Sequence, residues 1–556
     1  MHFGKSINYR REDIVGDIKY LWEPNRHLEL VSLAQAWHLS SEIRFLEGGR
    51  ALLNSWFDQN PYPLGVNWTS SLEHAIRLVN WVFAWHLFGG ENSPLFSGES
   101  GGSFRRRWLA SVYQHCFFIS GHFSKYSSAN NHLLGEYAGL FIASLTWPLW
   151  RESTHWLNTA RRGLEAQALA QNAKDGGNKE QAMWYHHEVA DMLLLCGLVG
   201  NANGIKLSTE YWACLESMLE FIASLMSVSG QLPMIGDSDD AVIVNLSTSR
   251  DVYRSLLATG TVLYQRGDFK MKAQYFDDKS RWLLGDEAKE QFDMLSGDQQ
   301  TLPVHRAFPD SGYYILGDAF ESADEIRMIA DAGSLGYLSI AAHGHADALS
   351  VTLSVAGVEI LIDPGTYAYH TNGAWRDYFK GTSAHNTIRV DRLDQSCSAG
   401  NFLWLQHANS ECLDFRIENC EDVWVAQHDG YSRLRDSVIH RRSIRFDRAE
   451  RCFHFVDSLL CREKHNVEIH WHCSEQCVVL VERDAAYIKA ENVLVEIRMP
   501  DCPWRPDLIQ GQIDPPLGWI SRSFDNKVQS PTISWKGIID GTTDLYTQMR
   551  VLRIED

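Results

Sequence analysis

Apolar residues recur at three- and four-residue intervals through the first half of the chain, from Asp17 to about Asp268. In the segment Leu72–Phe88 this spacing places the apolar side chains on one face of a helix. Comparable segments are Leu28–Leu46, Leu133–Leu145, Ala190–Leu198, Tyr211–Met226 and Val252–Leu263. About ten helices joined by short Gly-, Pro- and Asn-containing turns predict an array of helical hairpins. The periodicity alone does not distinguish a closed toroid from a solenoid.

The pattern changes after about Phe269, and the polar stretch Ala288–Pro303 is predicted to be a linker. Short alternating or β-branched runs follow at roughly ten-residue intervals, as expected for an antiparallel sandwich or stacked sheets. The runs are Gly312–Leu316, Ile326–Ala330, Leu349–Val355, Val358–Ile362, Ser443–Phe446, Cys452–Val456, Val467–His472, Val478–Val481 and Val493–Ile497. With 556 residues, 45% of them hydrophobic, the chain can form two cores. We therefore predict a helical domain over 1–290 and an antiparallel β domain over 291–556.

Ligand-type side chains gather in Ala341–Ile388, separated by predicted strands that a sheet could bring together. In His343-Gly344-His345 both imidazoles would point to one face of a strand, and the glycine leaves room for a close neighbour. His345, Asp363 and His385 together suit a divalent ion such as zinc or manganese, with a fourth position open. The alternative is a set of hydrogen-bonded polar residues in a β core.

The motifs HGHAD, IDPGTY and TSAHNT, in this order, resemble the β-domain signature of the heparinase II/III-like polysaccharide lyases. The resemblance extends back through most of the chain, to Gly65–Trp81, Ser128–Glu136 and Asp175–Glu188. It implies an incomplete α/α toroid followed by a β-sandwich, with the site where the two domains meet. The implied reaction is β-elimination: a base removes the C5 proton of a uronic acid and the bond to O4 breaks without water. The implied substrate is a glycosaminoglycan, with alginate as an alternative, and the metal is expected to be structural.

This reaction needs a group that neutralises the uronate carboxylate, a base and an acid. The resemblance assigns neutralisation to Asn131 and His132, although an asparagine at this position could equally cap a helix. Tyr185 could act as both base and acid, or His343 could be the base and Tyr185 the acid. A phenol loses its proton near pH 10, so a basic role for Tyr185 would require help from its surroundings. The alternative for Tyr185 is packing within a helix.

Other polar and aromatic residues of the motifs are expected to hold the sugar chain. Asn67, Trp68, Trp184 and Trp375 would offer stacking faces and hydrogen bonds, Gln181 a further polar contact, and Arg77 and Arg376 pairing with carboxylate or sulfate. Arg77 could instead pair with Glu73 on the same helix. Glu188 could orient Tyr185 or His132.

The net charge of −19 argues against nucleic acid and anionic membranes as partners. It conflicts with an anionic polysaccharide substrate as well, unless the cleft is locally cationic. No apolar run approaches the roughly 18 residues that a membrane span requires. The first fifteen residues lack a signal-peptide pattern, so a cytoplasmic protein is expected, or a periplasmic or secreted one if a leader was removed.

Two other classes of function remain open. Asp237, Asp239 and Asp240 could supply the paired carboxylates of a glycoside hydrolase on the same scaffold, or could simply form a turn after Gly236. A non-catalytic polysaccharide-binding protein is the second alternative, although Asn131, Tyr185 and His343 together are not needed for binding alone. The sequence does not indicate the uronan, its sulfation or the oligomeric state.

Overall fold

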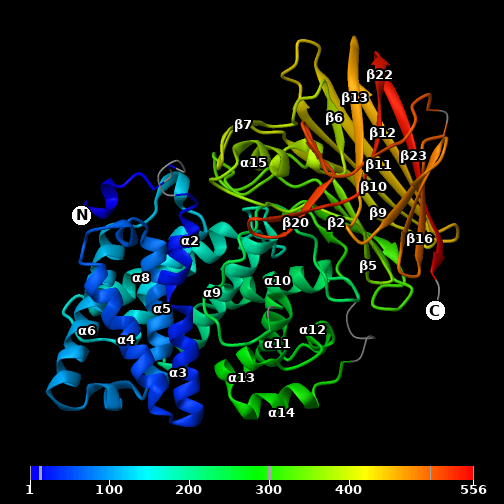
Figure 1. Cartoon of the computed structure of the whole chain (residues 1–556). Coiled ribbons are helices and arrows are strands. Elements are labelled where there is room, and N and C mark those ends of the chain that lie inside the picture. The colour runs from blue at the N-terminus through cyan, green and yellow to red at the C-terminus, as the bar shows by residue number, and fades with distance from the viewer. Residues whose placement is uncertain are drawn as a thin grey trace.

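The computed structural model describes residues 2–9, 11, 16–249, 251–297, 304–500 and 502–554. A helical domain is followed by a β domain, and the two lie against each other (Figure 1). Helix α2 (Lys19–Trp22) and the irregular segment 233–249 reach the β domain from the helical side: the Lys19 ammonium lies over the ring of Phe524, and the Phe524 amide donates to Asp240.

The larger helices form two layers in which alternate helices along the chain are neighbours. One layer contains α3 (Leu28–Ser40), α5 (Ser71–Leu87), α7 (Asn131–Thr146), α9 (Met183–Ala202) and α11 (Val252–Tyr264), each in contact with the next. The other layer contains α4 (Ile43–Gln59), α6 (Gly98–Gly121), α8 (Ser153–Gln171), α10 (Thr209–Leu225) and α12 (Gly267–Ala273). In this layer α4 contacts α6, and α10 contacts both α8 and α12. Two layers of alternating helices are the arrangement that a toroid of helical hairpins requires.

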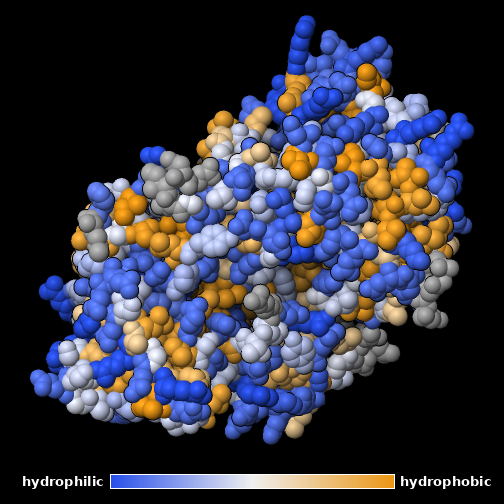
Figure 2. Space-filling view, in the orientation of Figure 1, coloured by the Kyte–Doolittle hydropathy of each residue, from blue (hydrophilic) through white to orange (hydrophobic). Residues whose placement is uncertain are grey.

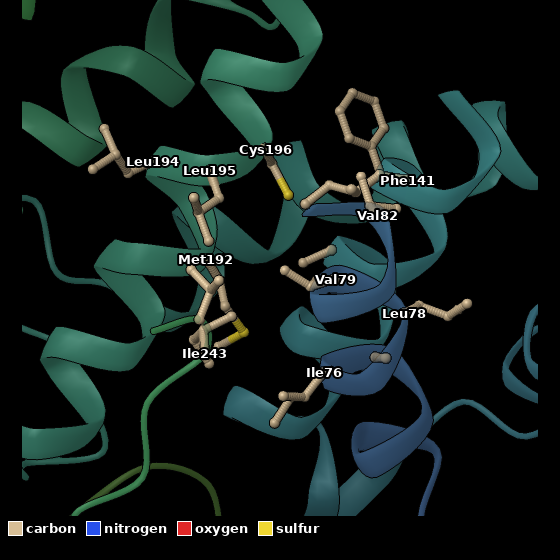
Figure 3. Packing of buried hydrophobic residues seen from close by; sticks show 14 of the residues in the cluster. Ile76, Leu78, Val79, Val82, Phe141, Met192, Leu194, Leu195, Cys196 and Ile243 are labelled. Atoms are coloured by element: carbon tan, nitrogen blue, oxygen red, sulfur yellow. The ribbon is translucent and has the colours of Figure 1, made fainter. Parts of the chain in front are cut away.

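Burial follows these layers. Helices α5, α7 and α9 are buried on nearly all sides, whereas α4 and α8 bury a single stripe. In Figure 3, Val79 and Val82 of α5 point toward Met192 and Cys196 of α9. A helix that is apolar all round must have neighbours on every side. The composition of α9 therefore agrees with the burial of Met183 and Tyr185 in its first turn.

The β domain consists mainly of three antiparallel sheets. A five-stranded sheet contains β1 (Ala307–Phe308), β2 (Tyr313–Asp318), β3 (Ile326–Asp331), β4 (Val351–Val355) and β5 (Val358–Leu361). An eight-stranded sheet has the order β14 (Val478–Val481), β15 (Ala485–Ala490), β16 (Val493–Arg498), β23 (Thr543–Ile554), β12 (Cys452–Leu460), β11 (Val438–Asp447), β10 (Glu421–Tyr431) and β9 (Ser410–Ile417). A four-stranded sheet has the order β17 (Asp507–Ile509), β22 (Thr532–Asp540), β13 (Lys464–His472) and β6 (Ile388–Val390).

The eight- and four-stranded sheets pack face to face. Residues of β11 alternate strictly between buried and half-buried, and its buried apolar residues Val438, Ile444 and Phe446 join one core with β13 and β22. The rings of Phe455 on β12 and Trp471 on β13 meet edge to face, 5.2 Å apart. The expected antiparallel stacked sheets are confirmed, and the strand runs predicted from the sequence lie on these strands or overlap them.

The predicted boundary lies at the end of the helical part of the chain, close to the first strand of the β domain. Residue 290 falls inside helix α14 (Asp286–Met294), which follows α13 (Asp278–Leu284). The expected linker Ala288–Pro303 is thus partly helical, and its residues 298–303 lie outside the described residues. Helix α14 gives little apolar signal in the sequence, because it is short and mostly polar and buries only Ala288 and Phe292.

The surface view in Figure 2 shows polar residues over much of both domains, with apolar patches between them. Within the described part of the chain, none of the helices has the length and apolar character needed to cross a membrane.

Candidate active site

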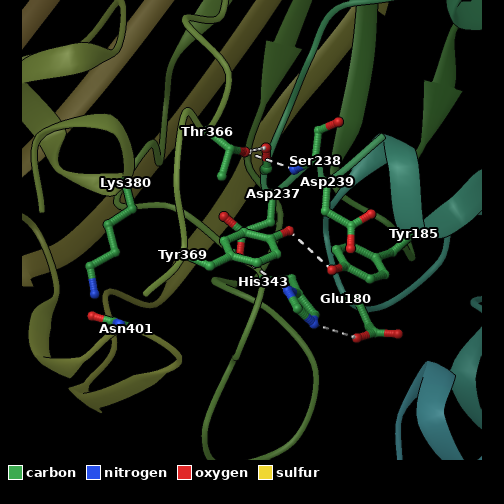
Figure 4. A network of polar contacts seen from close by, with 12 residues as sticks. Glu180, Tyr185, Asp237, Ser238, Asp239, His343, Thr366, Tyr369, Lys380 and Asn401 are labelled. Carbon is green, nitrogen blue, oxygen red and sulfur yellow. Dashed lines mark hydrogen bonds and ion pairs between the residues drawn. The ribbon is translucent and has the colours of Figure 1, made fainter. Parts of the chain in front are cut away.

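The site lies where the two domains meet, and segments far apart in the sequence form it (Figure 4). Tyr185 lies in the first turn of α9, and Asp237 in the segment between α10 and α11. His343 lies in an irregular loop of the β domain, and its carbonyl oxygen accepts from the Asp237 amide at 3.0 Å. Ser238 donates from its amide to the Thr366 hydroxyl at 2.7 Å. These two bonds fix the segment carrying Asp237 against the β domain.

Asp237 is the centre of the site and is fully buried. Its Oδ2 lies 3.0 Å from Nδ1 of His343, and its Oδ1 lies 3.0 Å from Nε2 of His345. The Arg376 guanidinium binds both carboxylate oxygens. Burial alone would raise the pKa of Asp237, but Arg376 and the two histidines hold it well below its usual range. Asp237 is therefore ionised, and neither turn formation nor general-acid catalysis describes its role.

The two histidines of HGH converge on this carboxylate, although they do not lie on a strand as predicted. Gly344 between them is required, since a Cβ there would collide with the carbonyl group of Leu335. Because a carboxylate only accepts, Nδ1 of His343 carries the proton and Nε2 has a free lone pair in the neutral ring. His343 is thus held in the tautomer of a general base.

Tyr185 stacks on His343, with ring centroids 3.8 Å apart. The hydroxyl groups of Tyr185 and Tyr369 point toward each other at 3.0 Å (Figure 4). Burial, together with the charges of Asp239 and Glu188, raises the pKa of Tyr185 well above its usual value. The phenol is therefore protonated, which suits an acid and not a base.

Asn131 opens α7, and its side-chain amide faces the carboxylate of Glu180. Asn130 donates to the same carboxylate at 3.0 Å and also caps the helix through the His132 amide. Glu180 Oε2 lies 3.8 Å from Nε2 of His343. Burial raises the pKa of Glu180, and burial with the nearby His343 lowers the pKa of His132 to about 4. The capping role belongs to Asn130, so the side chain of Asn131 serves the site.

The predicted metal ligands come together. One potential ligand atom each from His345, Asp363 and His385 lie within 4.8 Å of one another, and all three residues are buried. Nδ1 of His345 and Nε2 of His385 find no hydrogen-bond partner among the described residues. Two buried ring nitrogens without partners beside a carboxylate fit a divalent ion, and Asp237 on Nε2 of His345 would orient that ligand.

Three of the expected sugar-binding residues are structural instead. Trp68 is fully buried among Tyr62, His74, His115 and Phe118, so neither ring face can stack on a sugar. Arg77 is fully buried and donates to the Asn25 carbonyl, while Glu73 pairs with Arg26 instead. Asn67 is buried and donates to Asn60. The sequence could not reveal these roles, because residues far along the chain bury these side chains.

Arg376 is also not a substrate ligand in this structure. It is fully buried and divides its donors between Asp237 and the Asn401 carbonyl. Gln181 donates to the Ser311 carbonyl and joins the two domains. Glu188 is buried near Asp239, and burial and this charge raise its pKa well above the usual range.

Trp184 and Trp375 remain available to a ligand, since both are only half-buried. Trp184 lines a cavity of about 940 Å³ bounded by α3, α9, α13 and the segment 240–252, one residue from Tyr185. Trp375 lies beside Tyr367 and Trp519, with Lys527 over its ring. The residues that line this cavity include Trp184 and His187 of α9 but neither Tyr185 nor His343.

Glu180 and Tyr369 were not among the predicted site residues, and Asp237 was expected to be either a turn residue or a hydrolase carboxylate. Glu180 lies within the motif DGGNKEQ next to Gln181, and Tyr369 lies in YAYH directly after IDPG. Position within these motifs was the only available signal. Contact with His343 or Tyr185 is a property of the folded chain.

The protein combines a two-layered helical domain with stacked antiparallel sheets. Tyr185, His343 and Asp237 meet where the two domains join. The chain belongs to the heparinase II/III-like family: sequence models of the family's N-terminus and C-terminal part match residues 1–258 and 300–546. It is 24% identical over 454 residues to a heparin-sulfate lyase of Bacteroides thetaiotaomicron, covering 79% of this chain and 59% of that protein. It is 22% identical over 487 residues to the heparin-sulfate lyase of Pedobacter heparinus, covering 85% and 65%.

The fold is also similar to that of solved lyases. A crystal structure of a mutant of heparan sulfate lyase HepC from Pedobacter heparinus aligns with a TM-score of 0.70 at 18% identity, covering 100% of this chain and 80% of that one. The predicted toroid followed by a β-sandwich is thereby confirmed. The chain spans less than two thirds of the length of the two curated relatives.

Proposed function

We propose that this protein is a polysaccharide lyase that cleaves a glycosaminoglycan by β-elimination at a uronic acid. Family membership and the names of the relatives support a lyase. The observation that carries the proposal is the Asp237–His343 pair stacked beside a protonated Tyr185. It places a histidine whose Nδ1–H is held by a carboxylate next to a tyrosine that keeps its proton.

In this mechanism Nε2 of His343 takes the C5 proton. The ionised Asp237 holds Nδ1–H and stabilises the imidazolium that forms, so charge separation is compensated within the site. Arg376 keeps Asp237 ionised and in position. Of the two arrangements open from the sequence, these contacts favour His343 as the base.

Tyr185 then donates its proton to O4 as the glycosidic bond breaks. Its raised pKa makes the hydroxyl a poor base but leaves the proton in place for transfer to the leaving oxygen. The Tyr369 hydroxyl is its partner in the absence of substrate and must yield to O4. Because both hydroxyls are buried, binding of a polymer requires the two domains to separate locally.

Neutralisation of the uronate carboxylate falls to Asn131 and His132, helped by Glu180. The Asn131 amide donates to a carboxylate at this position already. Glu180, with its raised pKa, can carry a proton and donate it in a hydrogen bond to a second carboxylate. The enolate would then form at C5 and C6 next to hydrogen-bond donors, which stabilise its negative charge.

We further propose a structural zinc or manganese ion held by His345, Asp363 and His385. Such an ion would supply a fixed positive charge that rigidifies the loop carrying His343. The proton transfers above involve protein side chains alone.

The cavity favours a sparsely sulfated substrate. Its basic residues Lys279 and Arg522 are engaged by Asp191 and by Glu359 and Glu475, respectively. Asp240, Asp251 and Asp278 also line it. A densely sulfated chain would meet few unengaged cations here. Asp237 and Asp239 do not form the acid–base pair of a glycoside hydrolase, because the pKa values of both carboxyls are lowered and neither suits the general acid.

The test is to follow the ultraviolet absorbance of the new conjugated double bond. Wild-type protein and Tyr185→Phe are incubated with heparan sulfate, chondroitin sulfate, hyaluronan or alginate. Tyr264→Phe is the matched control, since its hydroxyl donates to the Trp212 carbonyl away from the site. Absorbance that rises for wild type and control but not for Tyr185→Phe supports elimination. New reducing ends without the chromophore would instead identify a hydrolase, and binding without product a non-catalytic protein.

A further inference from the structure

A second group of metal-ligand-type residues lies far from the active site. The first metal set is His345, Asp363 and His385. Among the described residues, Asp436, Cys461 and His465 form a second set, and their ligand atoms also lie within 4.8 Å of one another. Asp436 lies between β10 and β11, and Cys461 and His465 flank the turn from β12 to β13. His465 and His472 are seven residues apart on β13, roughly 23 Å at the usual strand rise. His472 contacts Ser383, close to the first metal set.

His465 is oriented as a metal ligand would be. Its side chain is 5% exposed, and Nδ1 lies 2.7 Å from Oδ2 of Asp391. A carboxylate that accepts from one ring nitrogen while the other faces a metal is the usual arrangement in zinc sites. The other nitrogen, Nε2, lies 3.1 Å from Oδ2 of Asp436. Two ligands at about 2.0–2.1 Å from a tetrahedral zinc are roughly 3.3 Å apart, so this pair is already close to the required spacing.

Cys461 supplies the sulfur. It is 8% exposed. Its Sγ lies 3.9 Å from the Leu459 carbonyl oxygen and 3.8 Å from the Glu463 carbonyl oxygen, which are long distances for hydrogen bonds. Such contacts hold a thiol weakly and leave Sγ free to turn toward an ion. A set of one sulfur, one imidazole and one carboxylate selects zinc over calcium, magnesium or manganese.

We propose that Asp436, Cys461 and His465 bind a zinc ion, with Asp391 orienting His465 and water as the fourth ligand. Zinc replaces the proton between His465 and Asp436 and the thiol proton of Cys461, so binding releases these two protons to solvent. The ion links the two packed sheets at one end, because β11 and β12 belong to the eight-stranded sheet and β13 to the four-stranded one. Its role is therefore structural and independent of the reaction.

Cobalt(II) tests this proposal, since it replaces zinc and gives a strong near-ultraviolet charge-transfer band only when a thiolate is bound. The set His345, Asp363 and His385 contains no sulfur and cannot produce that band. We expect the metal-free wild-type protein to develop the band. In His385→Gln, where the set His345, Asp363 and His385 lacks a ligand, the band should saturate at one cobalt per chain. Cys461→Ser, nearly isosteric, should lose it entirely, and zinc should raise the melting temperature of this variant less than that of wild type.

Two control variants separate this site from other thiols and from the first metal set. Cys420 is the exposed cysteine of the described residues, so Cys420→Ser removes the most accessible competing thiol and should keep the band. His385→Gln should keep it as well. No band in wild type, or a band that persists in Cys461→Ser, would overturn the proposal and leave His465 as an ion-paired imidazolium between Asp391 and Asp436. Equal melting of wild type and Cys461→Ser in chelator would verify that the variant folds.

Discussion

Oδ2 of Asp237 lies 3.0 Å from Nδ1 of His343, and the two residues come from different domains. The same carboxylate binds His345, a member of the first metal set, and the buried Arg376. One side chain therefore connects the proposed base, the proposed metal site and the domain interface. A substitution that disturbs the base, the metal site or the domain interface is therefore expected to affect the other two through Asp237.

Asp237→Asn should lower kcat by about 10³-fold, because the amide keeps the shape but no longer enforces the Nδ1–H tautomer of His343. It also leaves Arg376 buried without its counter-ion, which is expected to cost about 3 kcal/mol of unfolding free energy. The reaction rate at saturating substrate measures the loss of kcat. Unfolding in denaturant measures the loss of unfolding free energy separately. Asp540→Asn is the control for rate, since this exposed aspartate on β22 belongs to neither proposed metal site. A folded Asp237→Asn protein with nearly normal kcat would contradict the assignment of His343 as the base.

Tyr185→Phe should reduce kcat by about 10²–10⁴-fold, the usual contribution of a general acid. Tyr369→Phe removes the partner hydroxyl but leaves the donor in place, so a much smaller loss is expected. Comparing a substrate that has a good leaving group at C4 with the natural polymer sharpens the test. The activated substrate should largely restore Tyr185→Phe, since a good leaving group needs no proton. Failure of this rescue would assign the tyrosine a different role.

Chelation should lower the melting temperature at least as strongly as it lowers turnover, if the ion at His345, Asp363 and His385 is structural. The experiment is best performed in Cys461→Ser, so that only the inner site responds. His385→Gln in the same background removes a ligand and should make melting insensitive to chelator. Unchanged melting with complete loss of activity would indicate a catalytic ion instead.

Glu136 should make the protein less stable as the pH rises. Burial raises the pKa of this carboxyl to about 7, against the hydrogen bonds from Ser124. A group with a raised pKa in the folded state contributes stability below its unfolded pKa, about 4.3, and loses it as the pH rises to about 7. The loss amounts to at most about 4 kcal/mol. Urea unfolding at pH 5 and pH 8 should show a smaller difference for Glu136→Gln than for wild type, and parallel behaviour would refute the assignment.

Trp184→Ala and Trp68→Ala should fail in different ways. Trp184 lines the cavity, so its loss should raise KM severalfold with little change in melting. Trp68 is fully buried, and its truncation should cost about 3–5 kcal/mol of stability. Kinetics below the melting transition and thermal unfolding separate the two. A raised KM in a stable Trp68→Ala protein would restore Trp68 as a sugar-binding residue.

Much of the fold followed from local pattern. The three-and-four spacing in Leu72–Phe88 predicted α5, and alternation in runs such as Val467–His472 predicted β13, because one buried face sets the period of each element. The helical part of the expected linker Ala288–Pro303 was missed, because the polar α14 buries only two side chains and has little apolar signal.

The sequence by itself determined the classes of the elements, their order, and the motifs that carry Asn131, Tyr185, His343 and the metal set. Only the tertiary structure decided which polar residues meet. The sequence suggested that Asp237 was a turn residue or a hydrolase carboxylate. In the structure it binds Arg376, which is 139 residues away in the chain. Trp68 and Arg77 were expected to bind sugar, but helices from elsewhere in the chain bury both side chains. Burial and charge pairing depend on neighbours distant in sequence, whereas periodicity is a property of each segment alone.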